Sequence, residues 1–318
     1  MLEKPLIIVA LGGNAISKEN QEGSVDQQFE NSRATAVSLA NLIELGFGLV
    51  VTHGNGPQIG NFLLRNEAAA GAIYPLPMEV AVAHVQGGMG YMIAQALTNE
   101  LSRRDIDKAV TAIVTTVRVD ADDPSFLKPT KPIGRVLGKA DAEKYERGEG
   151  WSIKEISPGK YRRVVASPMP KYIMEIKTIR RAVQAGDLLV VCGGGGIPVI
   201  QSPREGLCGV KAVIDKDLAS SLLAVDLDAS YLMILTAVDY VSIDFGKPTE
   251  RQIKSMSADE ATGWLAEGQF PPGSMGPKVQ AAIQYLRSSR VPNPQVIIGP
   301  LEGASDALAG RIGTRITR

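Results

Sequence analysis

Short apolar runs alternate with longer stretches of helical spacing along most of this chain, and several of the runs end in a glycine-rich or polar loop. Residues 6–11 predict a buried strand, and apolar residues from Phe29 to Ile43 recur with helical spacing before Gly46. Further strands are expected at residues 49–52, 109–115, 188–191, 231–235 and 296–298, and a second helix at residues 78–104. This alternation predicts an α/β fold, a three-layer sandwich whose central sheet is mostly parallel.

Residues 119–166 interrupt the alternation. They show little periodicity and carry a charged stretch at residues 139–155. The prolines in this segment are Pro124, Pro129, Pro132 and Pro158. A long segment that does not continue the layers of a compact domain is often a lid. We therefore expect a single domain over residues 1–318 with a small protruding subdomain at about 119–166, bounded by a strand that ends at Thr115 and a helix that starts near Lys171.

Charge and cysteine content limit the possible partners. Lysine plus arginine equals aspartate plus glutamate at 34 each, which argues against nucleic-acid or membrane binding. Two cysteines, Cys192 and Cys208, form neither a disulfide framework nor a paired metal motif. The apolar run at residues 6–11 is too short for a signal-peptide core. A cytoplasmic protein is expected.

Four glycine-rich loops follow predicted strands or open a predicted helix. They occupy residues 12–14, 54–57, 193–196 and 273–278. Glycine lets backbone N–H groups approach an anion closely, and a following helix N-terminus adds a favourable dipole. Each loop alone could be a tight turn, but four in one chain favour phosphate binding. None matches the P-loop or the G-x-G-x-x-G fingerprint, so a nicotinamide dehydrogenase is not indicated.

Three lysines lie near such loops or in the proline-rich segment: Lys131, Lys216 and Lys278. In phosphoryl transfer the protein mainly positions the reactants and neutralises charge, a task that separate lysines suit. Any one of them could instead be a solvated surface lysine. Only two histidines occur. His84 is expected to be structural, whereas the sequence leaves open whether His53 is structural or lines the site. This scarcity of bases favours an acceptor that is already ionised, such as a carboxylate.

Taken in order, these motifs resemble the amino acid kinase family, and within it the carbamate kinases, almost from end to end. The matching segments are LGGNA at 11–15, HGNGPQ at 53–58, PTKPIG at 129–134, GGGGIP at 193–198, VIDKD at 213–217, LTAVDYV at 235–241 and GSMGPK at 273–278. The resemblance implies reversible phosphoryl transfer between ATP and carbamate with Mg²⁺, giving ADP and carbamoyl phosphate. It also implies a homodimer with joined central sheets, and ATP production in arginine or purine catabolism as the usual role.

The resemblance further implies roles for individual residues. Residues 1–210 would bind the acceptor and residues 211–318 the nucleotide. The catalytic residues would be Lys131, Lys216, Lys278 and Asp217. Phosphate and acceptor would bind Gly12, Gly13, Asn14, Gly54, Asn55, Gly56, Gly194 and Gly195. The nucleotide would bind Thr236, Val238, Tyr240, Met275, Gly276 and Lys278. No protein-held metal site is implied, because Mg²⁺ arrives with the nucleotide phosphates.

Other members of the superfamily usually carry a lysine in the first strand, and residues 8–11 contain none. In carbamate kinases a lysine of the protruding subdomain takes over that role, and Lys131 fits it. Two alternatives stay open, namely another small-acceptor kinase of the family and a non-catalytic protein of the same fold that binds nucleotides or anions. The physiological direction of the reaction is also open.

Overall fold

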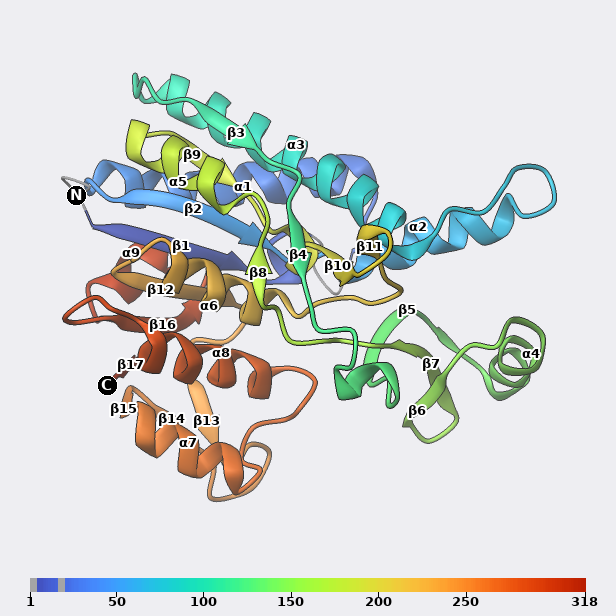
Figure 1. Ribbon diagram of the computed structural model, residues 1–318. Helices are drawn as coiled ribbons and strands as arrows, with labels where there is room; N and C mark the ends of the chain where they lie inside the picture. Colours follow the sequence, from blue (N-terminus) through green and yellow to red (C-terminus); the bar gives the residue numbers. More distant parts are fainter. Residues whose placement is uncertain (1–4, 17–20) are drawn as a thin grey trace.

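In a computed structural model, which describes residues 5–16 and 21–318, eight strands form a central sheet (Figure 1). Their order across the sheet is β15-β17-β16-β12-β1-β2-β9-β3. The strands are β1 (Leu6–Leu11), β2 (Gly48–His53), β3 (Val110–Ala112), β9 (Leu188–Val190), β12 (Tyr231–Thr236), β15 (Ser255–Ser257), β16 (Gln295–Pro300) and β17 (Thr314–Thr317). Every neighbouring pair is parallel except β16 and β17. The prediction of a mostly parallel sheet is confirmed.

Helices cover both faces of this sheet. Successive residues of β1 alternate between two apolar clusters, with Ile7 in one and Ile8 in the other, and both side chains are fully buried. Burial on both faces explains why β1 is a continuous apolar run rather than an alternating one. The first cluster includes side chains of α1 (Val25–Glu44), α2 (Gly56–Ala68), α3 (Met78–Arg103) and α9 (Ala304–Leu308). The second includes side chains of α5 (Ile176–Ala185), α6 (Lys216–Asp226), α7 (Ala258–Ala266) and α8 (Met275–Ser288). The three-layer sandwich is therefore confirmed.

Local sequence explains where the main helices begin and end. At the start of α1, Ser24 and Gln27 form a capping box, in which each side chain accepts a hydrogen bond from the other residue's backbone N–H. Soon after the helix ends, Gly46 adopts φ +92°, which favours glycine. At the start of α6 the carboxylate of Asp215 accepts a hydrogen bond from the backbone N–H of Asp217 at 2.9 Å.

No helix within residues 5–16 and 21–318 is long and apolar enough to span a bilayer.

A second sheet changes two of the predicted elements. Its order is β11-β10-β4-β8, and its strands are β4 (Thr116–Arg118), β8 (Tyr172–Ile173), β10 (Ile197–Ser202) and β11 (Gly206–Gly209). The prediction of a single strand at residues 109–115 is wrong, because the chain leaves the central sheet after Ala112 and continues in β4. Thr115 lies between the ends of β3 and β4, and its N–H donates a hydrogen bond to the Gln86 side chain at 2.5 Å. A helix starting near Lys171 is also wrong, since β8 pairs with β4 and α5 starts only at Ile176.

The segment around residues 119–166 contains a separate three-stranded sheet that protrudes beside α2 (Figure 1). Its elements are β5 (Lys131–Leu137), α4 (Lys139–Glu149), β6 (Ile153–Ser157) and β7 (Lys160–Val165), and we call this unit the protruding subdomain. Trp151 stacks on Tyr145 with ring centroids 4.3 Å apart, and the Arg163 guanidinium lies 4.1 Å from the Trp151 ring centre. Val119, in contrast, is buried in the main core. A hairpin of β13 (Val241–Ile243) and β14 (Arg251–Ile253) lies near the C-terminal helices.

Candidate active site

A cavity of about 400 Å³ lies where the carboxyl ends of β1, β2 and β12 meet. Loop residues after these strands line it, among them Gly12 after β1, Gly54 after β2 and Ala237 after β12. These strands are neighbours in the sheet although their sequences are far apart. The chain runs outward from β1 through β2 on one side and through β12 on the other, and open α/β sheets bind ligands at such a reversal of strand order.

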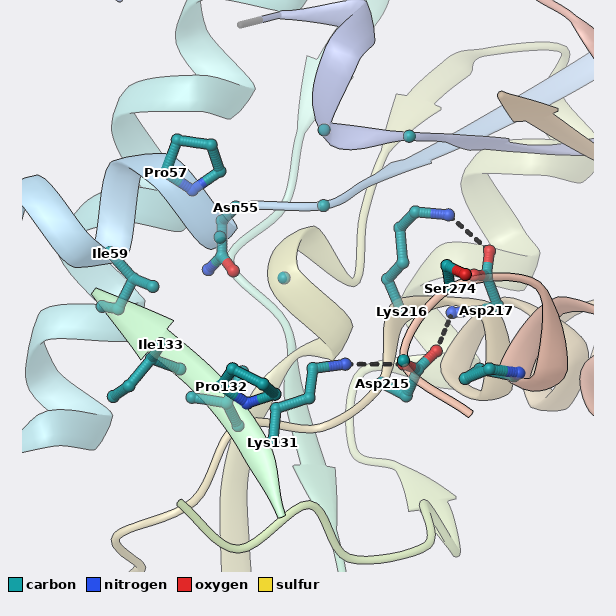
Figure 2. A pocket seen from close by; sticks show the side chains of 18 of the residues that line it. Asn55, Pro57, Ile59, Lys131, Pro132, Ile133, Asp215, Lys216, Asp217 and Ser274 are labelled. Carbon is teal, nitrogen blue, oxygen red and sulfur yellow. Dashed lines mark hydrogen bonds and ion pairs between the residues drawn. The ribbon is translucent and has the colours of Figure 1, made fainter. Parts of the chain in front are cut away.

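Three lysines and two aspartates form a connected group at this cavity, and Figure 2 shows four of them, Lys131, Asp215, Lys216 and Asp217. Lys131, from the protruding subdomain, donates to Asp215 with its Nζ 2.6 Å from Oδ2. Lys278, from α8, donates to Asp217 with its Nζ 3.0 Å from Oδ2. Lys216 donates to the other carboxylate oxygen of Asp217. Three ammonium groups against two carboxylates leave one net positive charge, which suits an anionic ligand.

Burial sets the ionisation of this group. The Lys216 side chain is 10% exposed and that of Asp217 is 4% exposed. Desolvation lowers the pKa of Lys216 to about 8, although the Asp217 carboxylate acts in the opposite direction. Burial would raise the pKa of Asp217, but the charges of Lys216 and Lys278 outweigh it and hold that pKa far below its usual range. Asp217 therefore stays ionised and orients two of the three lysines.

Three helices begin at the cavity: α2 at Gly56, α6 at Lys216 and α8 at Met275. The N-cap residues Asn55 and Ser274 make no side-chain capping hydrogen bond to α2 or α8, although the Gly276 N–H of α8 donates to the Pro271 carbonyl at 2.9 Å. The positive ends of the helix dipoles and uncapped N–H groups attract phosphate oxygens. The backbone therefore adds to the positive potential of the lysines.

The glycine run after β9 packs closely against Asn55, a donor at the cavity that follows β2. A Cβ atom on Gly194 would lie 2.0 Å from Nδ2 of Asn55, and one on Gly195 would lie 2.5 Å from the backbone oxygen of Ile214. Both residues also adopt positive φ angles, so neither position accepts another residue without strain. The Asn55 amide is buried, and its Nδ2 has no hydrogen-bond partner within the described part of the chain. A buried donor of this kind can bind an oxygen of a ligand.

The two histidines lie away from this cavity. His53 is 1% exposed and lines a separate groove beside β3, with its Nδ1 3.1 Å from the backbone oxygen of Gly54. Burial is the main cause that lowers the pKa of His53 to about 4, and the charge of Lys216 acts in the same direction. The contact with the Gly54 carbonyl raises the pKa, but by less. The ring is therefore neutral near pH 7 and does not face the candidate acceptor. His84 stacks obliquely on Phe62 with ring centroids 5.4 Å apart.

Most of the residues proposed from sequence meet at the cavity. Those that line it are Gly12, Gly13, Gly54, Asn55, Gly56, Lys131, Gly194, Lys216, Asp217, Thr236 and Lys278. Those that lie outside its lining are Gly195, Val238, Tyr240, Met275 and Gly276. The side chain of Asn14 lies outside the described part of the structure. Asp215 and Ser274 line the cavity but were missed, although Asp215 was identifiable as an N-cap residue directly before a predicted helix.

The carboxylates of the cavity bear on metal binding. In the part of the chain that the structure describes, no three histidine, cysteine, aspartate or glutamate side chains lie close enough together to hold a metal ion. Asp215 and Asp217 are the acidic residues among the lining residues, and both are paired with lysines. Their oxygens are of the type that Mg²⁺ binds, so they could contact an ion brought by phosphates without forming a cage of their own.

Comparison with known proteins agrees with this geometry. Residues 5–298 match the amino acid kinase family. The chain belongs to the amino acid kinase family. It is 44% identical over 313 residues to the carbamate kinase of Pyrococcus horikoshii, covering 98% of each chain. It is also 44% identical over 315 residues to the carbamate kinase of Clostridium perfringens, covering 98% of this chain and 99% of that one.

A solved structure extends the likeness to three dimensions. The carbamate kinase from Giardia lamblia bound to AMP-PNP matches with a TM-score of 0.91 and 37% identity, covering 100% of this chain and 99% of that one. The protruding subdomain is part of this match, since it lies within the covered chain. In the present chain β1 contains no lysine, and Lys131 reaches the cavity from the protruding subdomain instead.

Proposed function

We propose that this chain transfers a phosphoryl group reversibly between ATP and carbamate, giving ADP and carbamoyl phosphate. The observation that carries the proposal is the arrangement of Lys131, Lys216 and Lys278 around one cavity at the ends of parallel strands. The identity to carbamate kinases over nearly the whole chain supports carbamate as the acceptor.

Each part of the cavity has a role in this reaction. The three lysines neutralise the charge of the transferring phosphoryl oxygens, and Asp217 holds Lys216 and Lys278 in place. Glycine N–H groups and the Asn55 amide bind phosphate and acceptor oxygens. We assign acceptor binding to residues 1–210 and nucleotide binding to residues 211–318, because the lining residues after β1 and β2 fall in the first part and those of α8 in the second.

The chemistry of the lining residues fits an acceptor that needs no deprotonation. Among the described residues that line the cavity there is no histidine, cysteine or glutamate, and both aspartates are ion-paired. An alcohol acceptor would require a general base, whereas the carbamate oxygen is already ionised at neutral pH. The nucleotide phosphates would bring Mg²⁺, which supplies further charge neutralisation when bound, and Asp215 and Asp217 are the side chains that could contact it.

Purified protein should form ATP from ADP and carbamoyl phosphate, and only when Mg²⁺ or Mn²⁺ is added. A luciferase-coupled assay measures the product directly, and acetyl phosphate serves as the comparison donor. A higher kcat/KM with acetyl phosphate would assign the chain to another small acceptor. Nucleotide binding without turnover of either donor would instead favour a non-catalytic role.

The pH dependence of kcat/KM should follow the ionisation of Lys216. Because the pKa of Lys216 is lowered to about 8, its charged form is lost as the pH rises through that value in the free enzyme. The kcat/KM for carbamoyl phosphate should therefore fall above about pH 8. In Lys216→Arg, whose guanidinium stays charged, the basic limb should disappear whatever the absolute rate. A wild-type profile that stays flat to about pH 10 would contradict the assignment.

We also propose that two copies join their central sheets through β3. This strand is an edge of the sheet, and a groove of about 430 Å³ runs beside it. Val114 and Tyr91 line the groove and are 51% and 56% exposed, a liability that a second copy would cover. A monomer in analytical ultracentrifugation would contradict the proposed dimer.

Both cysteines are free, which agrees with a cytoplasmic location.

A further inference from the structure

Helix α2 and the protruding subdomain meet at two glycines. A Cβ atom built on Gly60 would lie 2.9 Å from the Cα atom of Gly134, and also close to the Gly134 backbone nitrogen at 3.4 Å. These neighbours are backbone atoms of β5, so no side chain can rotate away to make room. A Cβ atom at position 60 would fit only if the helix and the strand separated by about 0.5 Å, since ordinary contact begins at 3.4 Å.

Gly134 is an irregular point in β5. The pairing of β5 with β7 is regular from Lys131 to Ile133 and shifts register before Leu137, a β-bulge or similar irregularity. Gly134 adopts φ +70°, the left-handed region that favours glycine. Its carbonyl accepts a hydrogen bond from Nη2 of Arg162 at 2.8 Å. Gly60 and Arg162 thus both approach the backbone of Gly134.

The Gly134 backbone is directly connected to the residue that reaches the cavity. Ile133, beside Gly134, is 1% exposed and packs in the same apolar cluster as Ile59, beside Gly60. Lys131 lies three residues before Gly134 in the same strand and pairs with Val165, which is also buried in that cluster. Figure 2 shows β5 running from Lys131 at the cavity to Ile133 near Ile59. A displacement at Gly134 is therefore transmitted along a short, packed strand to the Lys131 ammonium.

We propose that Gly60 and Arg162 are positioning residues, which seat β5 on α2 and thereby set how far Lys131 reaches into the cavity. The inference rests on the proposed function, because it assumes that Lys131 acts on the transferring phosphoryl group. It adds a reason for a glycine in the middle of a helix, where the residue is otherwise unfavourable.

The test is Gly60→Ala, with Gly263→Ala as the matched control. Both glycines lie inside helices, but a Cβ atom on Gly263 meets nothing within 4 Å. Since a misplacement of about 1 Å can cost about a hundredfold, we expect kcat of Gly60→Ala to fall tenfold to a hundredfold, roughly, with the KM for ADP unchanged. Helix propensity favours alanine at both sites, so neither variant should melt earlier through loss of helix. Gly263→Ala should keep wild-type kinetics.

A double-mutant cycle with Lys131→Ala identifies the route of the effect. If Gly60 acts through Lys131, adding Gly60→Ala to Lys131→Ala should change kcat by less than about twofold. Wild-type kcat in Gly60→Ala, or an equal further loss in the Lys131→Ala background, would overturn the inference and leave the proposed function intact. An active Lys131→Ala would instead refute the role of Lys131 itself. If Gly60→Ala does not fold, Arg162→Gln enters the same cycle with the same expectation and the same outcomes.

Discussion

Replacing Lys216 with alanine should lower kcat by roughly 10²–10³-fold, as loss of one donor to a developing oxyanion does in other enzymes. Lys216 is the first residue of α6, is nearly buried and shares Asp217 with Lys278. In the proposed role its ammonium contacts the phosphoryl oxygens as their charge shifts during transfer, so the loss should appear mainly in kcat rather than in KM. The assay is the formation of ATP from ADP and carbamoyl phosphate.

The fold of this variant should persist, because Lys278 still pairs with Asp217 and because burying the Lys216 charge is itself unfavourable. Thermal melting checks this point. Lys177→Ala, on the exposed face of α5, is the control that removes a lysine away from the cavity and should keep full activity. If Lys216→Ala keeps more than about a third of the wild-type kcat, Lys216 is not a catalytic residue.

Replacing Lys131 with alanine should cost a comparable factor in kcat, roughly 10²–10³-fold, while the affinity for ADP changes little. Lys131 reaches the cavity from the protruding subdomain and pairs with Asp215 at 2.6 Å. No lysine of β1 can replace it, because that strand is entirely apolar. Under the proposed assignment of ADP binding to residues 211–318, Lys131 acts on the transferring phosphoryl group and not on ADP.

Lys128→Ala is the matched control for this variant. Lys128 lies three residues earlier, is exposed and does not line the cavity. Its loss should leave kcat unchanged. Isothermal titration with ADP separates binding from turnover in both variants. Equal kinetics of Lys131→Ala and Lys128→Ala would mean that the subdomain contributes no group to the reaction and that the reach of β5 into the cavity has no catalytic consequence.

Local sequence was sufficient for the elements that depend on neighbouring residues. The apolar run at residues 6–11 predicted β1 because a strand buried on both faces must be apolar throughout. The helical spacing of α1 and α3 predicted two helices of the sandwich. The glycine loops and the three lysines together predicted phosphate binding, and the structure brings residues of all four loops and the three lysines to one cavity.

Residues far apart in sequence meet in ways that periodicity does not encode. Lys131 and Asp215 are 84 positions apart, and their ion pair exists only because the protruding subdomain lies over the start of α6. His53 adjoins a cavity loop in sequence, yet its side chain faces away, because side chains of a strand alternate. Thr52 points to Ser220 on one face, with their hydroxyl oxygens 2.6 Å apart, and His53 points toward the groove on the other.

The chain sequence thus determined the layers, the loops and the residue types of the site, because these follow from hydrophobic spacing and from the chemistry of glycine and lysine. The tertiary structure alone decided which carboxylate orients each lysine, and why Gly60 and Gly194 must be glycine. These depend on how closely two backbones or a backbone and a side chain approach, as at Gly60 and Gly134. Close packing between segments is set by the whole fold, and no local pattern records it.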